Sequence, residues 1–332
     1  MKSGDSVFLG LDIGTTHIKA VAYDVRGEAR GIARVSTPAH ATHDGGAHYL
    51  AAELWTGTVQ AVRMCTEQLR DCRIEAVGIA SMAESGVLLD ASGEPAGPIL
   101  AWYDPRPGRF LGQVRELVPS LELFRRTGLR PHSKYSLLKL LWMKEHLPDA
   151  WKRAASWLHV AEYIAFRFTG VRRTEMSLAS RTMLFHIGRI SWDEELIREF
   201  GIKRELLQPV IPSGAACGTV GREAATQTGI PEGTPVTIAG HDHVVGTFGI
   251  GGTNEGDVVN SCGTAETLVV TVPPMEMRLF SEVPDFSVGC HVLPERRYAM
   301  LSVGTTGGVV EWFLRLAGWN YDRLLEALSA ER

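Results

Sequence analysis

An acidic residue followed by a glycine-threonine turn lies near the N-terminus and could bind the phosphates of a nucleotide. Residues 7–11 form an apolar run typical of a buried strand, and the polar group follows directly. A tight glycine turn points backbone N–H groups at a phosphate, while a carboxylate ending a buried strand is costly unless it holds a cation or a hydrogen-bonded partner. The residues that predict this Mg²⁺-nucleotide site are Asp12, Gly14, Thr15, Thr16 and Lys19. A β-hairpin with an Asp-capped turn is the alternative, and without a Walker A loop a P-loop NTPase is excluded.

A second carboxylate, Asp242, follows a strand-like segment that ends at Gly240. At the start of a helix its side chain can face a cleft while the N-terminal amides steady it. That placement suits a general base that takes a proton from a hydroxyl group. An N-cap without catalytic role is the alternative. His241 and His243 also permit a metal site, although the sequence shows no third ligand.

Two further acids, Glu84 and Asp104, follow strand-like segments, and Trp102 lies beside the second. Carboxylates hydrogen-bond to paired hydroxyls and an aromatic face packs on C–H surface, so these residues predict a polyhydroxylated ligand; surface loops are the alternative. A second glycine-threonine turn, Gly263-Thr264, is another candidate for binding phosphates.

The elements that must position these residues alternate between strands and helices. Strands are expected at residues 7–11, 18–23, 31–35, 74–80, 87–90, 235–240, 257–261, 267–270 and 298–303. Helices are expected around residues 54–69, 136–146, 154–168, 241–249 and 309–316, the third ending at Gly170. The first three strands form an antiparallel meander, and the later alternation predicts a mixed sheet in an α/β fold.

Length and composition exclude several classes of protein. The 332 residues suggest about two domains. The net charge of −4 gives no reason to expect nucleic acid or an anionic membrane as partner. Five cysteines without a C-x-x-C pair argue against a disulfide scaffold or structural zinc and favour the cytoplasm. No leader-like apolar stretch or apolar run of membrane-spanning length is found, so neither a signal peptide nor a span is expected.

Together these motifs resemble the FGGY family of carbohydrate kinases, in the actin-like ATPase superfamily. The matching segments, in the family's order, are residues 10–16, 80–90, 102–106, 127–142, 240–242, 261–264 and 307–312. The resemblance implies an actin-like (ribonuclease H-like) two-domain ATPase fold with mixed sheets. It places a sugar-binding N-terminal domain at 1–248 and a partial nucleotide-binding domain at 255–332, because the family's chains are longer and carry an adenosine-binding segment further downstream.

The resemblance also implies the activity, which is ATP-dependent phosphorylation of a sugar or polyol hydroxyl. Asp242 would be the general base and Asp12 would hold Mg²⁺. The residues that would bind the ATP phosphates are Gly14, Thr15, Thr16, Lys19, Gly263 and Thr264, together with Asp12. Those that would bind the acceptor are Glu84, Asp104, Lys134, Asp242 and His243.

Three positions depart from the family's patterns. Ala83-Glu84-Ser85 replaces the Met-His-Gly of xylulokinase-like members and keeps only the acid of the Arg-Glu in glycerol-kinase-like members. Lys134 stands near the sequence position at which glycerol kinases have a tyrosine. His243 occupies the position after the proposed base, where relatives often have Asn or Gln. These changes favour an acidic or otherwise unusual polyol as acceptor.

Two other functions remain open at this stage. The chain could be a non-catalytic actin-like protein that binds sugar or nucleotide, or an inactive fragment of a kinase. A metal-dependent hydrolase that uses His241 and His243 is a further alternative. In each case the expected partner is a small molecule, with a possible homodimer.

Overall fold

The computed structural model describes the chain except for residues 1–5, 71, 263–265, 275–285, 304–305 and 331–332. Its first sheet has the strand order β14-β15-β6-β1-β2-β3. The strands are β1 (Ser6–Ile13), β2 (His17–Asp24), β3 (Ala29–Ser36), β6 (Arg73–Ser81), β14 (Ala216–Thr219) and β15 (Pro235–His241). Strands β1, β6 and β15 run parallel, whereas β2, β3 and β14 pair antiparallel, which confirms the predicted meander and the mixed sheet.

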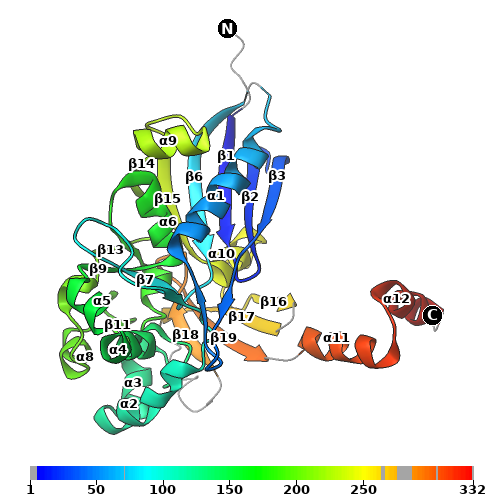
Figure 1. Cartoon of the computed structure of the whole chain (residues 1–332). Coiled ribbons are helices and arrows are strands. Elements are labelled where there is room, and N and C mark those ends of the chain that lie inside the picture. The colour runs from blue at the N-terminus through cyan, green and yellow to red at the C-terminus, as the bar shows by residue number, and fades with distance from the viewer. Residues whose placement is uncertain (1–5, 71, 263–265, 275–285, 304–305, 331–332) are drawn as a thin grey trace.

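Helices cover this sheet. The helix α1 (Ala51–Thr66) packs on β2 and β3, and α6 (Val160–Thr169) packs on β6 and β15 (Figure 1). Along β1, every second residue from Val7 to Ile13 is buried, as expected for a strand. Around this sheet the structure also has four elements that were not predicted. They are α9 (Arg222–Thr228) and the short strands β4 (His40–Ala41), β5 (Ala47–Tyr49) and β8 (Ile99–Leu100).

A helical layer occupies residues 106–206. Its helices are η1 (Arg106–Phe110), α2 (Leu111–Leu117), α3 (Ser120–Thr127), α4 (Ser136–His146), α5 (Pro148–Arg153), α7 (Met176–Ala179), α8 (Glu194–Glu199) and η2 (Arg204–Leu206). Four short strands lie within this range: β9 (Ser156–His159), β10 (Thr174–Glu175), β11 (Phe185–His186) and β12 (Ser191–Trp192). Two more, β7 (Gly86–Leu89) and β13 (Val210–Ile211), lie outside it in sequence and pair with β9 and β10. The helix at 136–146 is confirmed.

The predicted helix at 154–168 is wrong in its first part. Residues 156–159 form β9, which pairs antiparallel with β7. All four residues of β9 are buried, so the run carries no alternation that separates a strand from a buried helix. The helix α6 starts only at Val160, where His159 and Glu162 form a capping box, and it ends at Gly170, whose φ of 72° is left-handed.

A second sheet, of order β16-β17-β19-β18, follows the helix α10 (Asp242–Gly249). Its antiparallel strands are β16 (Val258–Cys262), β17 (Glu266–Val272), β18 (Ser287–Cys290) and β19 (Arg297–Val303). Val272, Val288 and Ala299 share one core with the leucines of α4, so this sheet packs on the helical layer. The domain boundary expected between 248 and 255 stays a prediction.

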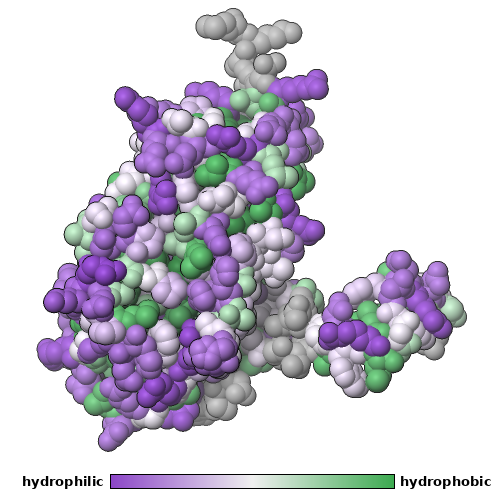
Figure 2. Space-filling model, viewed as in Figure 1, coloured by the Kyte–Doolittle hydropathy of each residue, from purple (hydrophilic) through white to green (hydrophobic). Residues whose placement is uncertain are grey.

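The last two helices, α11 (Thr306–Ala317) and α12 (Tyr321–Ala330), extend away from the rest of the molecule (Figure 1). They carry exposed apolar side chains, among them Trp312, Leu316 and Leu325 (Figure 2). The helix predicted at 309–316 is confirmed. Among the described residues, no helix combines the length and the apolar character that crossing a membrane requires.

Candidate functional site

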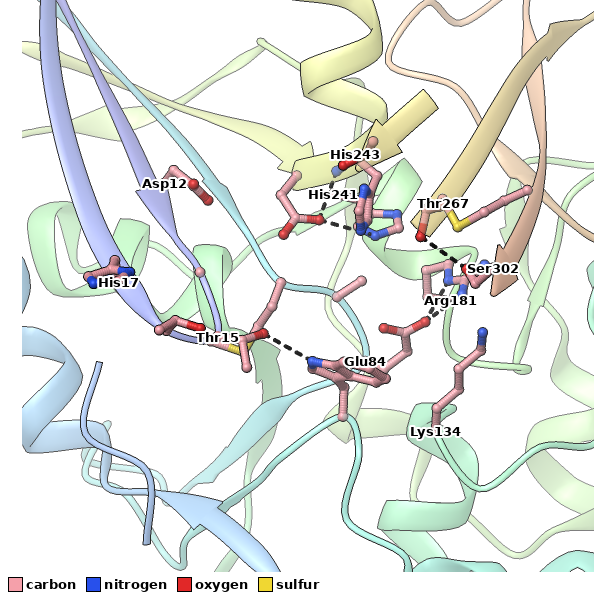
Figure 3. Close-up of a pocket in the computed structure, with 18 of the residues that line it drawn as sticks. Asp12, Thr15, His17, Glu84, Lys134, Arg181, His241, His243, Thr267 and Ser302 are labelled. Atoms are coloured by element: carbon pink, nitrogen blue, oxygen red, sulfur yellow. Dashed lines mark hydrogen bonds and ion pairs between the residues drawn. The ribbon is translucent and has the colours of Figure 1, made fainter. Parts of the chain in front are cut away.

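A cavity of about 730 Å³ lies between the carboxyl ends of β1, β6 and β15 and the second sheet (Figure 3). Asp12, Glu84 and Asp242 line it because parallel strands present their carboxyl ends at the same sheet edge. The other predicted residues in its lining are Gly14, Thr15, Thr16, Lys19, Lys134 and His243. Ser261, Thr267 and Ser302 close it from the second sheet. The predicted Gly263 and Thr264 lie outside the described residues.

The first glycine-threonine turn joins β1 to β2. Its closure is tight, because the Gly14 N–H donates to the His17 carbonyl at 3.0 Å and the Thr37 hydroxyl donates to the Gly14 carbonyl at 2.8 Å. The Trp102 indole N–H donates to the Thr15 hydroxyl at 3.0 Å, which joins this turn to the segment at 102–106. These hydrogen bonds fix the position of the turn in the lining of the cavity.

Asp12 has one oxygen engaged and one without a partner. Lys19 Nζ lies 3.0 Å from Asp12 Oδ2. Asp12 Oδ1 is buried and takes no hydrogen bond within the described parts of the chain. A buried carboxylate oxygen without a donor is well suited to a hard cation such as Mg²⁺, so Asp12 fits the predicted metal role.

Asp242 is the first residue of α10 and faces the cavity. Its Oδ1 accepts the His243 backbone N–H at 2.7 Å and lies 3.3 Å from His241 Nε2. Burial raises the pKa of Asp242 to about 6; His243 opposes this and the nearby charge of Asp12 adds to it. Burial also holds the pKa of His241 well below its usual range, so His241 is neutral. A carboxylate whose pKa is raised, beside a neutral imidazole, is a suitable general base near neutral pH.

The turn into α10 is shaped by Gly240 and by a relay beneath it. The Ser177 hydroxyl accepts the His241 N–H at 2.9 Å and donates to Glu175 Oε2 at 2.6 Å. Gly240 has φ of +124°, and a Cβ there would lie 2.8 Å from Glu175 Oε2 and closer still to Ser177 Oγ. Burial raises the pKa of Glu175 to about 7. The glycine of the Gly-x-Asp segment is thus required by geometry.

Glu84 is held by a residue that the sequence analysis missed. Arg181 Nε and Nη2 donate to Glu84 Oε1 at 2.8 and 2.5 Å, and Arg181 Nη1 donates to Ser287 Oγ at 3.1 Å and to the Tyr298 hydroxyl at 3.3 Å. Both charged side chains are buried. Burial would raise the pKa of Glu84, but the positive charges around it, Arg181 foremost, lower it to about 2.

A signal for Arg181 was present in the sequence. It is the one Lys, Arg, Asp or Glu residue between Met176 and Phe185, and a lone charge in such an apolar stretch must be paired once it is buried. The sequence could not name the partner, because Glu84 lies 97 positions away. His132 and Met300 are further lining residues that sequence reasoning did not find.

Asp104 is placed differently from the other predicted acceptor residues. It is fully buried, and Arg106 Nη2 donates to its Oδ2 at 2.7 Å while the Ala47 N–H donates to it at 3.2 Å. Trp102 lines the cavity, whereas Asp104 is not among the described residues that do. The carboxylate braces the segment that carries Trp102.

The sequence model of the N-terminal domain of the FGGY family of carbohydrate kinases matches residues 7–249. The chain belongs to this family. An L-fuculokinase of Salmonella typhi is 29% identical over 319 residues, covering 93% of this chain and 66% of the relative. A gluconokinase of Bacillus subtilis is 24% identical over 314 residues, covering 93% of this chain and 60% of the relative.

The fold of the chain also resembles that of a solved carbohydrate kinase. The crystal structure of xylulose kinase from Rhodospirillum rubrum superimposes with a TM-score of 0.89 at 25% identity, covering 97% of this chain and 66% of that one. The expected actin-like fold with mixed sheets is confirmed. This FGGY chain therefore spans about two thirds of the length of the relatives it matches.

Replacing Gly240 by alanine is expected to lower the free energy of unfolding by about 1–3 kcal/mol, because the new Cβ meets Ser177 and Glu175 and the φ is unfavourable. Equilibrium urea unfolding measures the change. Gly246→Ala is the control, since Gly246 lies in α10 with open space around it, and it is expected to be neutral or slightly stabilising. Equal effects of the two substitutions would contradict the steric explanation.

Glu84→Gln is expected to destabilise the protein by about 3–5 kcal/mol, because it leaves the Arg181 guanidinium buried without its counter-charge. Adding Arg181→Met to that variant is expected to cost much less than Arg181→Met costs alone. A double-mutant cycle from urea unfolding measures this coupling. Additive effects of the two substitutions would show that the pair is energetically unimportant.

The same pair predicts an acid dependence of stability. Since folding lowers the pKa of Glu84 from 4.5 to about 2, the stabilisation is complete above the unfolded pKa and is lost as the pH falls through that interval. Unfolding curves of wild type and Glu84→Gln should therefore converge as the medium is acidified. A constant difference between them down to pH about 2 would contradict this assignment.

Proposed function

We propose that this chain carries the acceptor site, the catalytic base and part of the Mg²⁺-ATP site of a carbohydrate kinase. The observation that supports this most is the cavity in which Asp242, with its raised pKa, faces Asp12 and the first glycine-threonine turn. In the reaction, the acceptor hydroxyl gives its proton to Asp242 and its oxygen bonds to the γ-phosphorus. The bond from that phosphorus to the β–γ bridging oxygen breaks, which releases ADP.

The acceptor is proposed to lie along the wall formed by Glu84, Lys134 and His243. Glu84 Oε1 is occupied by Arg181, and Oε2 takes no hydrogen bond from any described residue, so it is available to accept from a sugar hydroxyl. Asp104 is proposed to act indirectly, by fixing the segment that presents Trp102 to the cavity. This arrangement suits a polyhydroxylated ligand.

The nucleotide is proposed to bind with its phosphates at the turn of Gly14, Thr15 and Thr16, near Lys19. Asp12 would hold Mg²⁺, which when bound neutralises charge on the phosphates. Gly263 and Thr264 are proposed to supply the second turn, on the strength of the family resemblance. Backbone N–H groups and threonine hydroxyls position the phosphates without contributing chemistry of their own.

The cell compartment is also inferred from the cysteines. All five are free, and Cys65, Cys217 and Cys290 are buried. We infer a reducing, cytoplasmic setting, in which unpaired thiols are ordinary.

Asp242→Asn is expected to lower kcat about 10²- to 10⁴-fold, because an amide cannot take the proton. ADP release in the presence of ATP, Mg²⁺ and a panel of ketoses, polyols and sugar acids measures the effect, and calorimetry shows whether acceptor binding survives. Asp149→Asn, an exposed position in α5, is the matched control and should behave as wild type. Undiminished turnover by Asp242→Asn would remove the proposed base.

The pH profile offers a separate check. A base with a raised pKa is active when deprotonated, so kcat/KM is expected to fall as the pH drops below about 6 and to level off above it. Initial rates across that range measure the profile. A profile without this acid limb would argue that another group, or no group, removes the proton.

A further inference from the structure

One end of the cavity carries more positive than negative charge. Glu84 and Arg181 cancel each other's charge as an ion pair, in which two nitrogens of Arg181 donate to Glu84 Oε1. Lys134 adds positive charge beside them. The buried Lys139 donates to the Lys134 carbonyl, and burial lowers the pKa of Lys139 to about 7, so it adds only part of a positive charge near neutral pH. The charge of Lys134 helps to lower the pKa of Glu84, and the charge of Glu84 opposes the lowering of the pKa of Lys139 by burial. Both lysines therefore lie near Glu84.

The imidazoles at this end do not alter the balance. Burial, followed by the charge of Lys134, lowers the pKa of His132. Burial, followed by Arg181, lowers the pKa of His241 well below its usual range. Both rings are therefore neutral near pH 7. Asp104 adds no negative charge to the cavity, because Arg106 neutralises it.

Lys134 differs from the other cations that line the cavity. Lys19 is paired with Asp12 and Arg181 with Glu84. The Lys134 ammonium lies 5.4 Å from the centroid of the Tyr135 ring, and among the described residues it has no carboxylate within ion-pair distance. Its side chain is half-buried and enters the cavity from the side opposite His243 (Figure 3).

A cation in this position has a chemical consequence for the ligand. A neutral polyol can accept a hydrogen bond from Lys134 but cannot compensate its charge beside Arg181. A carboxylate supplies a charge-assisted hydrogen bond, which is stronger than a neutral one. Glu84 Oε2 meanwhile remains available for a hydroxyl of the same ligand.

We propose that the acceptor is a sugar acid, whose carboxylate binds Lys134 while a hydroxyl elsewhere on its carbon chain reaches Asp242. This inference rests on the proposed kinase function and narrows its substrate class. The transfer is unchanged: the hydroxyl proton goes to Asp242, the oxygen bonds to the γ-phosphorus, and ADP leaves. The carboxylate takes no part in bond making and serves only to bind and orient the acceptor.

Matched ligand pairs test this inference. Binding of five- and six-carbon aldonates is compared by calorimetry with binding of the alditols of the same configuration, which replace the carboxylate by a hydroxymethyl group. Wild type is expected to bind one aldonate about 10- to 100-fold more tightly than its alditol, the range of a charged hydrogen bond. ADP release in the presence of ATP and Mg²⁺ is measured on the same pairs.

Variants assign the preference to Lys134. Lys134→Met is expected to abolish the preference for the aldonate and Lys134→Arg to retain most of it. Lys152→Met, at an exposed position of α5 away from the cavity, is the matched control and should leave the preference unchanged. Thermal unfolding of each variant shows that it is folded.

The outcomes separate this inference from the proposed function. If alditols or ketoses bind and are phosphorylated while aldonates are not, the sugar-acid inference is overturned and the kinase proposal stands. If aldonates bind with the predicted dependence on Lys134 but no ligand supports ADP release, the inference about the ligand holds and the kinase proposal fails for this chain. Tighter binding of a sugar phosphate than of every aldonate, or a preference that Lys134→Met leaves intact, overturns the inference.

Discussion

The parallel alignment of β1, β6 and β15 imposes the main electrostatic constraint on this molecule. It brings Asp12, Glu84 and Asp242 to one edge of the sheet, where three carboxylates around one cavity repel one another. The structure resolves the repulsion differently at each position. Lys19 pairs with Asp12 and Arg181 neutralises Glu84, whereas Asp242 pairs with no lysine or arginine among the described residues. Burial raises the pKa of Asp242, and the nearby charges of Asp12 and Glu84 add to this rise. The unneutralised carboxylate is the one suited to accept a proton.

The buried guanidinium of Arg181 also joins parts of the fold that are distant in sequence. One side of it binds Glu84, in the loop after β6, and the other side donates to Ser287 on β18 and Tyr298 on β19. An arginine can do this because its donors form a planar fork that satisfies several acceptors at once. The side of the cavity that carries Glu84 and the second sheet are consequently parts of one hydrogen-bonded network, and the geometry of Glu84 depends on both.

The position of Asp242 is likewise supported by residues that lie outside the cavity. Ser177 and Glu175 hold the backbone where β15 turns into α10, and Gly240 leaves the space that they occupy. Neither side chain touches the cavity, yet both determine where the carboxylate of Asp242 lies. Trp102 and Asp104 have the same relationship, since the buried acid braces the loop whose aromatic ring lines the cavity.

The sequence by itself determined the local elements and the ends of strands. Apolar runs bounded by glycine predicted β1, β15 and α10, and so located Asp12 and Asp242, because those signals depend only on near neighbours in the chain. Tertiary structure alone decided that residues 156–159 are a strand, since their burial comes from pairing with β7. It also decided that Arg181 pairs with Glu84, which lies 97 positions away in the sequence. Which charges neutralise one another depends on the distances between folded segments, and local periodicity carries no information about those distances.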